Sequence, residues 1–521
     1  MDNRDIIIGI DAGTSVVKAV AFDLQGQQLG TGAVRNHYHS GPDGSAQQDM
    51  ARTWRDCVRA IRLLALDVAN LAQRTAALAV TAQGDGSWLV GKNNQPVSDA
   101  WIWLDGRAAP TVQALSASPQ ARARFEATGT GLNTCQQGAQ LAHMSRHYPD
   151  LLQRAEVALH CKDWLYLNLT GVRATDPSEA SFTFGNFRHR HYDDRVIDAL
   201  GLSAHRRLLP EIIEGTQTVH PLTTEAAHAT GLYEGTPVCL GYVDMVMTAL
   251  GAGVHTGEEN TGCSIVGSTG VHMRAVSAEQ VWLNQEQTGY VIALPLPGMV
   301  TQVQTNMAAT LNLDWALQMA ESLINDFGGQ VDHGKLVSHI DRWLSEARPD
   351  SLLFHPYISE AGERGPFVNA DARASFIGLN PRHGFADLLR AVIEGIGLAA
   401  RDCYQAMGEV PREIRLSGGA GRSARLREIF AAALGAPVRV NVREEAGAAG
   451  AAMMAAVAIG AYADMESCID SWVTPLLGSC EQPDALQQAR FTALYDSYRQ
   501  ARTLLPPVWS GLHDVRKRFE S

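Results

Sequence analysis

The sequence predicts an α/β protein built from two related domains. Its 521 residues exceed what one ordinary hydrophobic core accommodates. The start of the chain has the pattern of three short strands joined by turns, over 5–10, 16–22 and 27–35. Helical patterning follows over 50–73, and an apolar strand over 76–81. A second hairpin with a similar Gly/Ser/Thr tip lies about half a chain later, which indicates a duplicated domain.

Both hairpin tips carry more polar groups than a turn requires. The first reads DAGTS over 11–15, and the second reads GSTG over 267–270. Glycine lets backbone N–H groups approach a phosphate closely, and hydroxyls add donors without bulk. Since a carboxylate repels phosphate unless a divalent cation lies between them, Asp11 predicts a Mg²⁺–nucleotide site. Two unrelated hairpin turns are the alternative interpretation.

A third glycine-rich turn follows a short strand in the C-terminal half. The segment 414–440 reads IRLSGGAGRSARLREIFAAALGAPVRV, in which a strand ends at SGGAG and Ser423 is the predicted N-cap of a helix. Such a turn lets a flat ring or a ribose lie on the backbone, and an ordinary tight connection is the simpler alternative. The chain contains no GxxxxGK[ST] loop and no GxGxxG after a strand, which excludes P-loop and dinucleotide-binding enzymes.

Asp244 is the only charged residue between Glu234 and Glu258. It is either a helix N-cap or a general base, because a partly desolvated carboxylate beside a hydroxyl can accept its proton during phosphoryl transfer. Two loops of the N-terminal half also place polar groups after apolar runs. They offer Gln83, Asp85, Asp105 and Arg107 to hydroxyl groups, with Trp103 as a packing face for carbon atoms. Ordinary surface loops are the alternative.

Charge and composition exclude several classes of partner. The net charge is −12 and no Lys/Arg-rich run occurs, so neither nucleic acid nor an anionic membrane is an expected partner. The eight cysteines are scattered without a CxxC pair, which argues against a zinc ribbon or a disulfide scaffold. The uncharged Ala/Gly-rich segment 446–463 is predicted as a buried helix rather than a membrane span. Because the N-terminus lacks a signal-peptide pattern, we expect a cytoplasmic protein.

Six stretches, in order along the chain, resemble motifs of the FGGY carbohydrate kinases of the actin-like ATPase superfamily. They are GIDAGTSVVKAVAFD (9–23), KDWLYLNLTGVRATDPSEAS (162–181), GYVDMVMTALGAG (241–253), SIVGSTG (264–270), ASFIGLNPRHGFADLLRAVIEG (374–395) and LSGGAGRSARLREIFAAALGAPV (416–438). The resemblance implies two ribonuclease H-like domains, 1–252 and 253–521, with a catalytic cleft between them. It also implies ATP and Mg²⁺, and a homodimer is common in the family.

The same resemblance implies roles for individual residues. Asp11 would act at Mg²⁺, and Asp244 would take the proton of the attacking hydroxyl. The residues implied to hold ATP are Gly13, Thr14, Ser15, Gly267, Ser268, Thr269, Gly270, Gly418, Gly419, Ala420 and Ser423.

The substrate is predicted chiefly from the residues that follow Gln83. Glycerol kinases carry Arg-Glu there and D-xylulose kinases Met-His, whereas this chain has Gly84 and Asp85. Asp85 keeps a carboxylate for substrate hydroxyls, and Gly84 is expected to leave room for a longer polyol. Met245 stands where glycerol kinases carry glutamine, which argues against glycerol.

The stretches 79–91, 128–143 and 241–253 are most similar to those of family members that phosphorylate erythritol. We therefore predict ATP-dependent phosphorylation of a terminal hydroxyl of erythritol. The implied substrate residues are Gln83, Gly84, Asp85, Trp103, Asp105 and Met245. A pentulose kinase for xylulose or L-xylulose is the close alternative. A non-enzymatic nucleotide switch of the same fold is more remote, since it would not need Asp85, Asp105 and Asp244.

Overall fold

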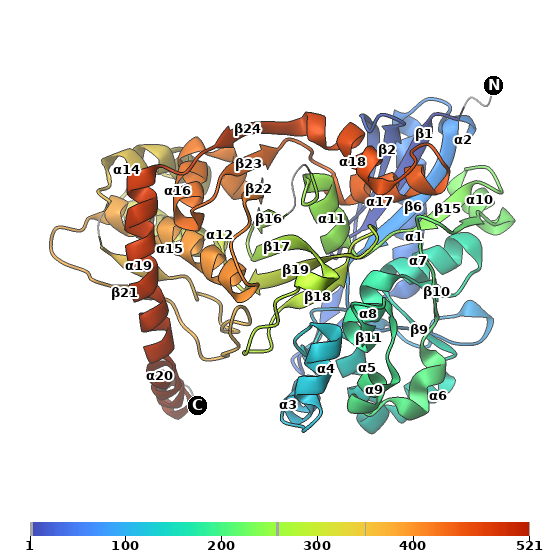
Figure 1. Cartoon of the computed structure of the whole chain (residues 1–521), viewed down its shortest axis with the longest axis horizontal. Helices are drawn as coiled ribbons and strands as arrows, with labels where there is room; N and C mark the ends of the chain where they lie inside the picture. Colours follow the sequence, from blue (N-terminus) through green and yellow to red (C-terminus); the bar gives the residue numbers. More distant parts are fainter. Residues whose placement is uncertain (1–3, 257–259, 350, 520–521) are drawn as a thin grey trace.

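The computed structural model describes residues 4–256, 260–349 and 351–519, which form two large sheets with helices around them (Figure 1). The first sheet has the strand order β14-β15-β6-β1-β2-β3. Its strands are β1 Ile6–Ala12, β2 Val16–Asp23, β3 Gln28–Arg35, β6 Thr75–Ala82, β14 Val219–Pro221 and β15 Pro237–Leu240. β1, β2 and β3 pair antiparallel in succession, and β6 is parallel to β1 and β15. The four strands predicted in this part are confirmed.

The second sheet repeats this topology. Its order is β18-β19-β17-β16-β22-β23-β24. The strands are β16 Thr261–Val266, β17 Gly270–Ser277, β18 Tyr290–Ala293, β19 Met299–Asn306, β22 Glu413–Gly418, β23 Val438–Asn441 and β24 Leu477–Glu481. β16 pairs antiparallel with β17 and parallel with β22, β17 pairs antiparallel with β19, and β22 runs parallel to β23. β19-β17-β16-β22-β23 therefore matches β3-β2-β1-β6-β15 strand for strand, which confirms the predicted duplication.

Helices separate and cover the two sheets in layers. α1 Met50–Asp67 and α7 Cys161–Thr170 share a hydrophobic cluster with one face of the first sheet. α11 Asp244–Ala252, α17 Ala446–Ala458 and α18 Met465–Trp472 share another cluster with its opposite face and with the second sheet. The far face of the second sheet packs against α12 Thr310–Asp326, α15 Phe385–Ala406, α16 Ala424–Leu434 and α19 Ala485–Leu504. In Figure 1, α11 and α17 accordingly lie between the two sheets.

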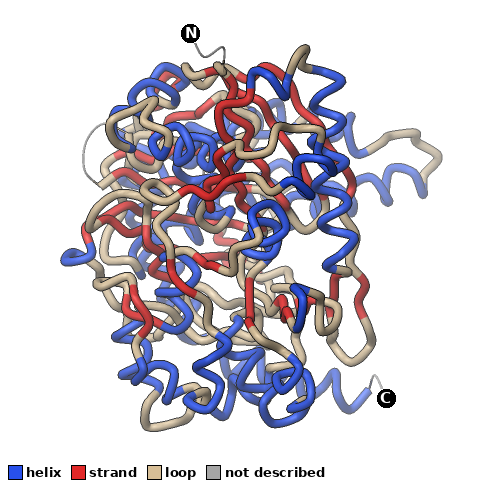
Figure 2. The backbone as a smooth tube through the Cα atoms, turned by 90° about the vertical axis from the view of Figure 1, so that its right-hand side faces the viewer, coloured by secondary structure: helices blue, strands red, loops and turns tan. Residues whose placement is uncertain are grey.

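Smaller elements surround these layers, and Figure 2 shows the helices mainly outside the strands. Further helices are α2 Leu71–Arg74, α3 Ala109–Ser116, α4 Ala121–Thr128, α5 Gln137–His147, α6 Pro149–Arg154, α8 Pro177–Phe184, α9 Asp194–Ala199, α10 Thr224–Thr230, α13 His333–Ser338, α14 Ile340–Glu346 and α20 Pro506–Phe519. The short strands are β4 His39–Ser40, β5 Ala46–Gln48, β7 Trp88–Val90, β8 Ala100–Trp101, β9 Val157–Leu159, β10 Ala174–Thr175, β11 Gly185–Asn186, β12 His191–Tyr192, β13 Glu211–Ile212, β20 Leu353–His355 and β21 Ser375–Ile377.

Two helical predictions have different outcomes. The patterning over 50–73 forms two helices rather than one, because Asn70 adopts a left-handed conformation with φ 55° between α1 and α2. The Ala/Gly-rich segment forms the buried helix that was predicted: every residue from Ala446 to Ala456 in α17 is buried. Within the described residues, no helix is long and apolar enough to cross a membrane.

The small residues of α17 allow unusually close backbone packing. A Cβ added at Gly9 of β1 would lie 2.1 Å from the carbonyl oxygen of Ala448 in α17. A Cβ added at Gly450 would lie 2.2 Å from the carbonyl oxygen of Met247 in α11. Any larger residue at either position would push backbones apart. Glycine therefore holds α17 directly against both the first sheet and α11.

We predict that Gly9→Ala destabilises the protein by about 1–3 kcal/mol, since the extra methyl group overpacks a contact between two backbones. Urea unfolding followed by circular dichroism measures the change. Gly511→Ala in α20 is the matched control, because nothing lies within 4 Å of an added Cβ there. Equal stability of the Gly9 variant and the wild type would contradict the close packing of α17 on β1.

Candidate active site

The parallel register of the first sheet brings three predicted segments to one edge. Ala12 of β1 pairs with Ala82 of β6, and Val80 of β6 pairs with Leu240 of β15. The loops that follow these strands contain the first hairpin tip, the segment 83–85 and the start of α11. Because parallel strands end at the same edge of a sheet, residues far apart in the sequence meet here.

Thr14 of the first tip contacts two of the predicted substrate residues directly. Its hydroxyl donates a hydrogen bond to Gln83 Oε1 at 2.9 Å and accepts one from Trp103 Nε1 at 2.8 Å. Gln83 is buried, and its amide nitrogen donates to Gln48 Oε1 at 2.6 Å. The tip is held from the other side by Asn36, whose amide nitrogen donates to the Gly13 carbonyl at 3.0 Å. Ser15 is exposed at the outer end of the tip.

Asp11 lies at the end of β1 against the first turn of α17. A Cβ added at Gly447 would be 2.6 Å from Asp11 Oδ2 and 3.1 Å from Thr248 Oγ1 of α11. Next to it, Lys18 Nζ of β2 forms an ion pair with Glu445 Oε2 at 2.7 Å. Loss of hydration raises the pKa of Asp11 to about 6, although the Lys18 ammonium opposes this change.

Asp244 is the first residue of α11, and Val243 occupies the N-cap position. Its half-buried carboxylate accepts a hydrogen bond from its neighbour's backbone, Met245 N, at 2.6 Å. Loss of hydration raises the pKa of Asp244 well above its usual range, and the negative charge of Asp11 adds to this effect. The backbone N–H of Val243 donates to Ser178 Oγ of α8 at 3.1 Å, which ties the start of α11 to α8.

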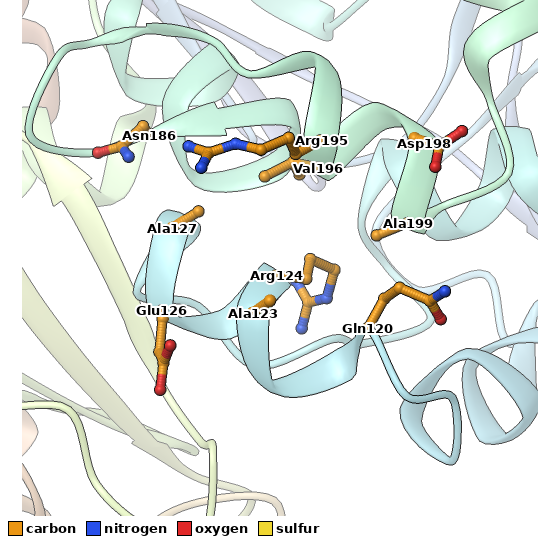
Figure 3. Close-up of a pocket in the computed structure, with 10 residues that line it drawn as sticks. All are labelled: Gln120, Ala123, Arg124, Glu126, Ala127, Asn186, Arg195, Val196, Asp198 and Ala199. Atoms are coloured by element: carbon orange, nitrogen blue, oxygen red, sulfur yellow. The ribbon is translucent and has the colours of Figure 1, made fainter.

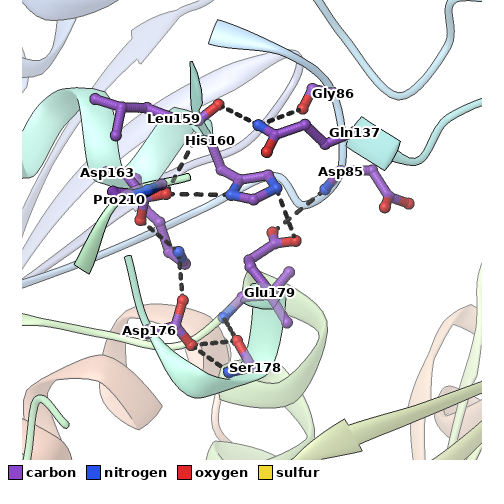
Figure 4. A network of polar contacts seen from close by, with 12 residues as sticks. Asp85, Gly86, Gln137, Leu159, His160, Asp163, Asp176, Ser178, Glu179 and Pro210 are labelled. Carbon is purple, nitrogen blue, oxygen red and sulfur yellow. Dashed lines mark hydrogen bonds and ion pairs between the residues drawn. The ribbon is translucent and has the colours of Figure 1, made fainter. Parts of the chain in front are cut away.

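Asp85 belongs to a polar network that reaches α7 and α8 (Figure 4). Its backbone N–H donates to Glu179 Oε1 at 3.3 Å. Glu179 Oε2 lies 3.4 Å from His160 Nε2. Burial raises the pKa of Asp85 to about 6, while a hydrogen bond with Cys135 and the charges of His160 and Arg364 oppose the rise. One Asp85 oxygen, Oδ1, is buried and has no hydrogen-bond partner among the described residues.

The network continues to a fully buried ammonium group. His160 Nδ1 lies 3.1 Å from Asp163 Oδ2, and Lys162 Nζ lies 2.6 Å from Asp163 Oδ1 and 2.5 Å from Asp176 Oδ2. Burial alone would raise the pKa of Asp163, but the Lys162 and His160 charges outweigh it and hold this pKa below its usual range. Burial raises the pKa of Glu179 to about 7. These ion pairs fix α7 and α8 relative to each other behind Asp85.

Sequence reasoning did not single out His160, Glu179 or Arg364. Glu179 lies inside the motif 162–181, so a signal for it existed, namely a carboxylate three residues after Asp176. Arg364 comes from the C-terminal half, and its positive charge is near enough to oppose the rise of the Asp85 pKa. Nothing in the sequence pattern indicates that approach, because it depends on how the two halves pack.

One expectation about Gly84 was wrong. We expected this glycine to leave room for a longer polyol, but a Cβ at this position would lie 2.4 Å from Val243 Cγ2 and 3.2 Å from Glu179 Oε1. The space beside Gly84 is therefore filled by protein. Glycine is needed here because the segments that carry Asp85 and Asp244 approach each other closely.

Asp105 and Met245 take part in local packing. Asp105 is fully buried, and its oxygens accept hydrogen bonds from Arg107 at 2.5–3.1 Å and from the Ala46 backbone at 2.9 Å. Arg107 in turn lies over the Trp101 ring, 3.4 Å from its centroid. Met245 is half-buried against the cluster that contains α11 and α17. The Asp105 carboxylate thus bonds to Arg107 of its own loop and to the backbone of β5.

The second tip and the glycine turn share one edge of the second sheet. Val266 of β16 pairs with Gly418 of β22, so both strands end side by side. Ser268 and Thr269 are exposed, and the Gly267 carbonyl accepts hydrogen bonds from the Thr310 backbone and hydroxyl at 2.9 Å each. Gly270 opens β17 at the end of this tip. None of the hydrogen bonds recorded for the described residues joins this tip to the first.

The turn after β22, which is predicted to lie under the adenosine, exposes its backbone at Gly418 and Gly419. Gly418 adopts φ +88°, and an added Cβ would lie 2.5 Å from the Val266 carbonyl oxygen. Gly419 is exposed, with nothing within 4 Å of an added Cβ. Ser423 is the N-cap of α16, as predicted, since its hydroxyl accepts from Leu426 N at 3.2 Å. The backbone of Ala420 lies in the 3₁₀ turn Gly419–Arg422, and its side chain is outside the described part.

Comparison with known proteins agrees with this arrangement. The model of the FGGY family of carbohydrate kinases, N-terminal domain, matches residues 6–251, and that of the C-terminal domain matches residues 262–459. The chain is 65% identical over 511 residues to the erythritol kinase of Brucella abortus (strain 2308), covering 98% of each chain. It is 29% identical over 508 residues to the xylulose kinase of Escherichia coli (strain K12), covering 96% of this chain and 99% of that one.

Solved structures show the same fold. The xylulose kinase from Rhodospirillum rubrum superposes with a TM-score of 0.87 at 22% identity, covering 97% of this chain and 100% of that chain. The two family models together cover most of the sequence, one on each repeated sheet. The chain therefore belongs to the FGGY family of carbohydrate kinases, and it is a two-domain kinase of actin-like fold for which ATP is the phosphoryl donor.

Proposed function

We propose that this enzyme transfers the γ-phosphoryl group of ATP to a terminal hydroxyl of erythritol. The observation that carries the choice of substrate is the 65% identity, over 98% of both chains, with a protein named erythritol kinase. The geometry agrees with a small polyhydroxylated substrate, since Gln83 and Trp103 contact Thr14 of the first tip, Asp85 follows Gln83 by two residues, and all three carry hydrogen-bonding groups. The buried Asp85 Oδ1, which has no hydrogen-bond partner among the described residues, is proposed as an acceptor for a substrate hydroxyl.

Asp244 is proposed as the general base. The hydroxyl oxygen of the polyol forms a bond to the γ-phosphorus, the bond from that phosphorus to the bridging oxygen breaks, and ADP leaves. Asp244 takes the proton of the attacking hydroxyl. A carboxylate in a charge-rich and partly desolvated place holds a proton more tightly than one in water, which makes it a stronger base. The raised pKa of Asp244 supports this role.

The phosphates are proposed to lie between the two hairpin tips, with adenosine on the Gly418–Gly419 turn. Exposed Ser268 and Thr269 and the open face of Gly419 support this placement. Mg²⁺ is proposed to be held by Asp11. Among the described residues, no group of three His, Cys, Asp or Glu side chains forms a metal cage. A single carboxylate still fits, because Mg²⁺ is usually bound by one or two carboxylates together with substrate phosphates and water. The bound ion would neutralise charge on the phosphates.

Glu179 is proposed to position Asp85 rather than to contact the reacting atoms. It accepts the Asp85 backbone hydrogen bond and is held in turn by His160. Its neighbour Ser178 accepts from Val243, next to the proposed base. The first turn of α8 thus sets the separation of the proposed polyol carboxylate and the proposed base. The domain boundaries 1–252 and 253–521, the cytoplasmic location, the absence of a nucleic-acid partner and the homodimer stay predictions.

The direct test is an assay of ADP release with erythritol, threitol, glycerol, xylitol, D-xylulose and L-xylulose at matched concentrations. We predict the highest kcat/KM for erythritol, by about tenfold or more over any other compound. A compound whose hydroxyl groups differ in number or configuration leaves buried polar groups of the site without a hydrogen bond. A higher kcat/KM for a pentulose would replace the proposed substrate with the pentulose alternative. Failure of all six compounds to raise ADP release would refute the proposal.

We expect Asp244→Asn to lower kcat by about 10²–10⁴-fold, because an amide cannot accept the hydroxyl proton. ATP binding, measured by calorimetry, should survive, since the amide oxygen can still accept from Met245. Asp150→Asn on an exposed turn of α6 is the matched control for the change of charge. Activity of the Asp244 variant within a few-fold of wild type would remove Asp244 from the role of base.

Asp85→Ala should raise the KM for erythritol by about 10- to 100-fold, because hydrogen bonds to a charged group are lost. The KM for ATP should change little, since Asp85 lies on the side of Gln83 rather than at the second tip. Steady-state kinetics with each substrate varied in turn give both values. A parallel rise in both KM values would indicate general damage to the fold, and an unchanged KM for erythritol would place Asp85 outside the polyol site.

A further inference from the structure

A cavity of about 450 Å³ lies between α4 and α9, on a part of the N-terminal half that the proposed reaction does not use (Figure 3). This volume is within the range of about 300–1,000 Å³ found for small-molecule sites. Helix α8 packs against both α4 and α9. Because α8 also carries Glu179, the cavity is close to the network behind Asp85 without belonging to it.

The notable lining residue is Arg124 of α4. Its side chain is only 7% exposed, and Figure 3 shows it in the hollow between α4 and α9. No hydrogen bond or ion pair of its guanidinium group is recorded with any residue in the described ranges. Burial lowers the pKa of Arg124 to about 10, and no carboxylate lies close enough to raise it again. A buried cation without a partner is costly, so such groups in proteins are normally paired.

The other charged residues around the cavity already have partners. Arg195 Nη2 lies 2.7 Å from Asp193 Oδ2. Glu126 Oε1 lies 2.7 Å from Arg122 Nε, and Asp198 Oδ1 accepts from Ser203 Oγ at 2.9 Å. Arg195 and Glu126 are thus ion-paired, and Asp198 is held by a neutral hydroxyl, whereas Arg124 has no ion-pair partner among the described residues.

Asn186 of β11 also lines the cavity. Its amide oxygen accepts a hydrogen bond from Arg188 N at 3.0 Å. In Figure 3, Asn186 lies at the edge of the hollow on the side of Arg195, and its amide points away from Arg124. A guanidinium group presents two parallel N–H donors that match the oxygens of a phosphate or a carboxylate. We propose that the cavity between α4 and α9 is a binding site for a small oxyanion, the phosphate or carboxylate group of a metabolite, held by Arg124.

The test measures thermal unfolding of the full-length enzyme at constant ionic strength, with sodium chloride replaced stepwise by sodium phosphate or by sodium malonate. Saturating ADP and erythritol are present throughout. Wild type is compared with Arg124→Met, and Arg59→Met is the matched control, since it removes the same charge from an exposed position of α1 that does not line the cavity. Anion bound at the hairpin tips affects all three proteins alike, so the difference between wild type and Arg124→Met reports the cavity.

We expect the apparent dissociation constant of the anion to rise about tenfold or more in Arg124→Met and to stay unchanged in Arg59→Met. A shift with phosphate alone assigns the site to phosphate esters, a shift with malonate alone to carboxylates, and a shift with both to oxyanions generally. Arg124→Lys keeps a positive charge at this position and replaces Arg124→Met in the test if that variant does not fold. It should bind the anion more weakly than wild type. Identical anion dependence in wild type and in the Arg124 variant would overturn the proposal.

Discussion

The structure depends on the close packing of α17 against β1 and α11. Gly9 and Gly450 remove the side chains that would keep these backbones apart. The two helices form a layer whose hydrophobic cluster includes residues of both sheets. Because α17 comes from the C-terminal half and packs on the first sheet, the chain joins its two halves through this layer as well as through the connection after α11. The edges that carry the polar loops are positioned by the same contact.

The proposed chemistry is concentrated at the ends of that layer. Asp244 begins α11, and Asp11 lies against the first turn of α17, beside Gly447. Asp85 and Glu179 add two further carboxylates. Burial raises the pKa values of all four groups, and the negative charges of Asp11, Glu179 and Asp85 add to the rise at Asp244. Such a concentration of carboxylates opposes folding, and perturbed groups of this kind cluster at functional sites.

A turn, a helix start or a candidate site residue could be predicted from the sequence where neighbouring residues carried the signal. Polar groups in excess of a turn marked both hairpin tips, the serine after SGGAG marked the N-cap of α16, and the isolated charge in an apolar stretch marked Asp244. Contacts between distant segments could not be predicted. The hydrogen bonds of Thr14, the support of Asp85 by Glu179 and His160, and the filled space beside Gly84 all depend on how strands and helices meet. Arg124 was missed for the same reason, since only packing shows that it is buried, with no ion-pair partner in the described part of the chain.

The central claim is that the shared layer of α11 and α17 places one polyol hydroxyl at Asp244 while both hairpin tips hold the same nucleotide. A crystal structure of the enzyme with erythritol and ADP tests it most directly. The account predicts a terminal hydroxyl of erythritol within hydrogen-bonding distance of an Asp244 oxygen, and ADP phosphate oxygens in contact with residues of both tips, 13–15 and 267–270. Erythritol bound away from Asp244, or ADP held by one tip alone, would contradict it.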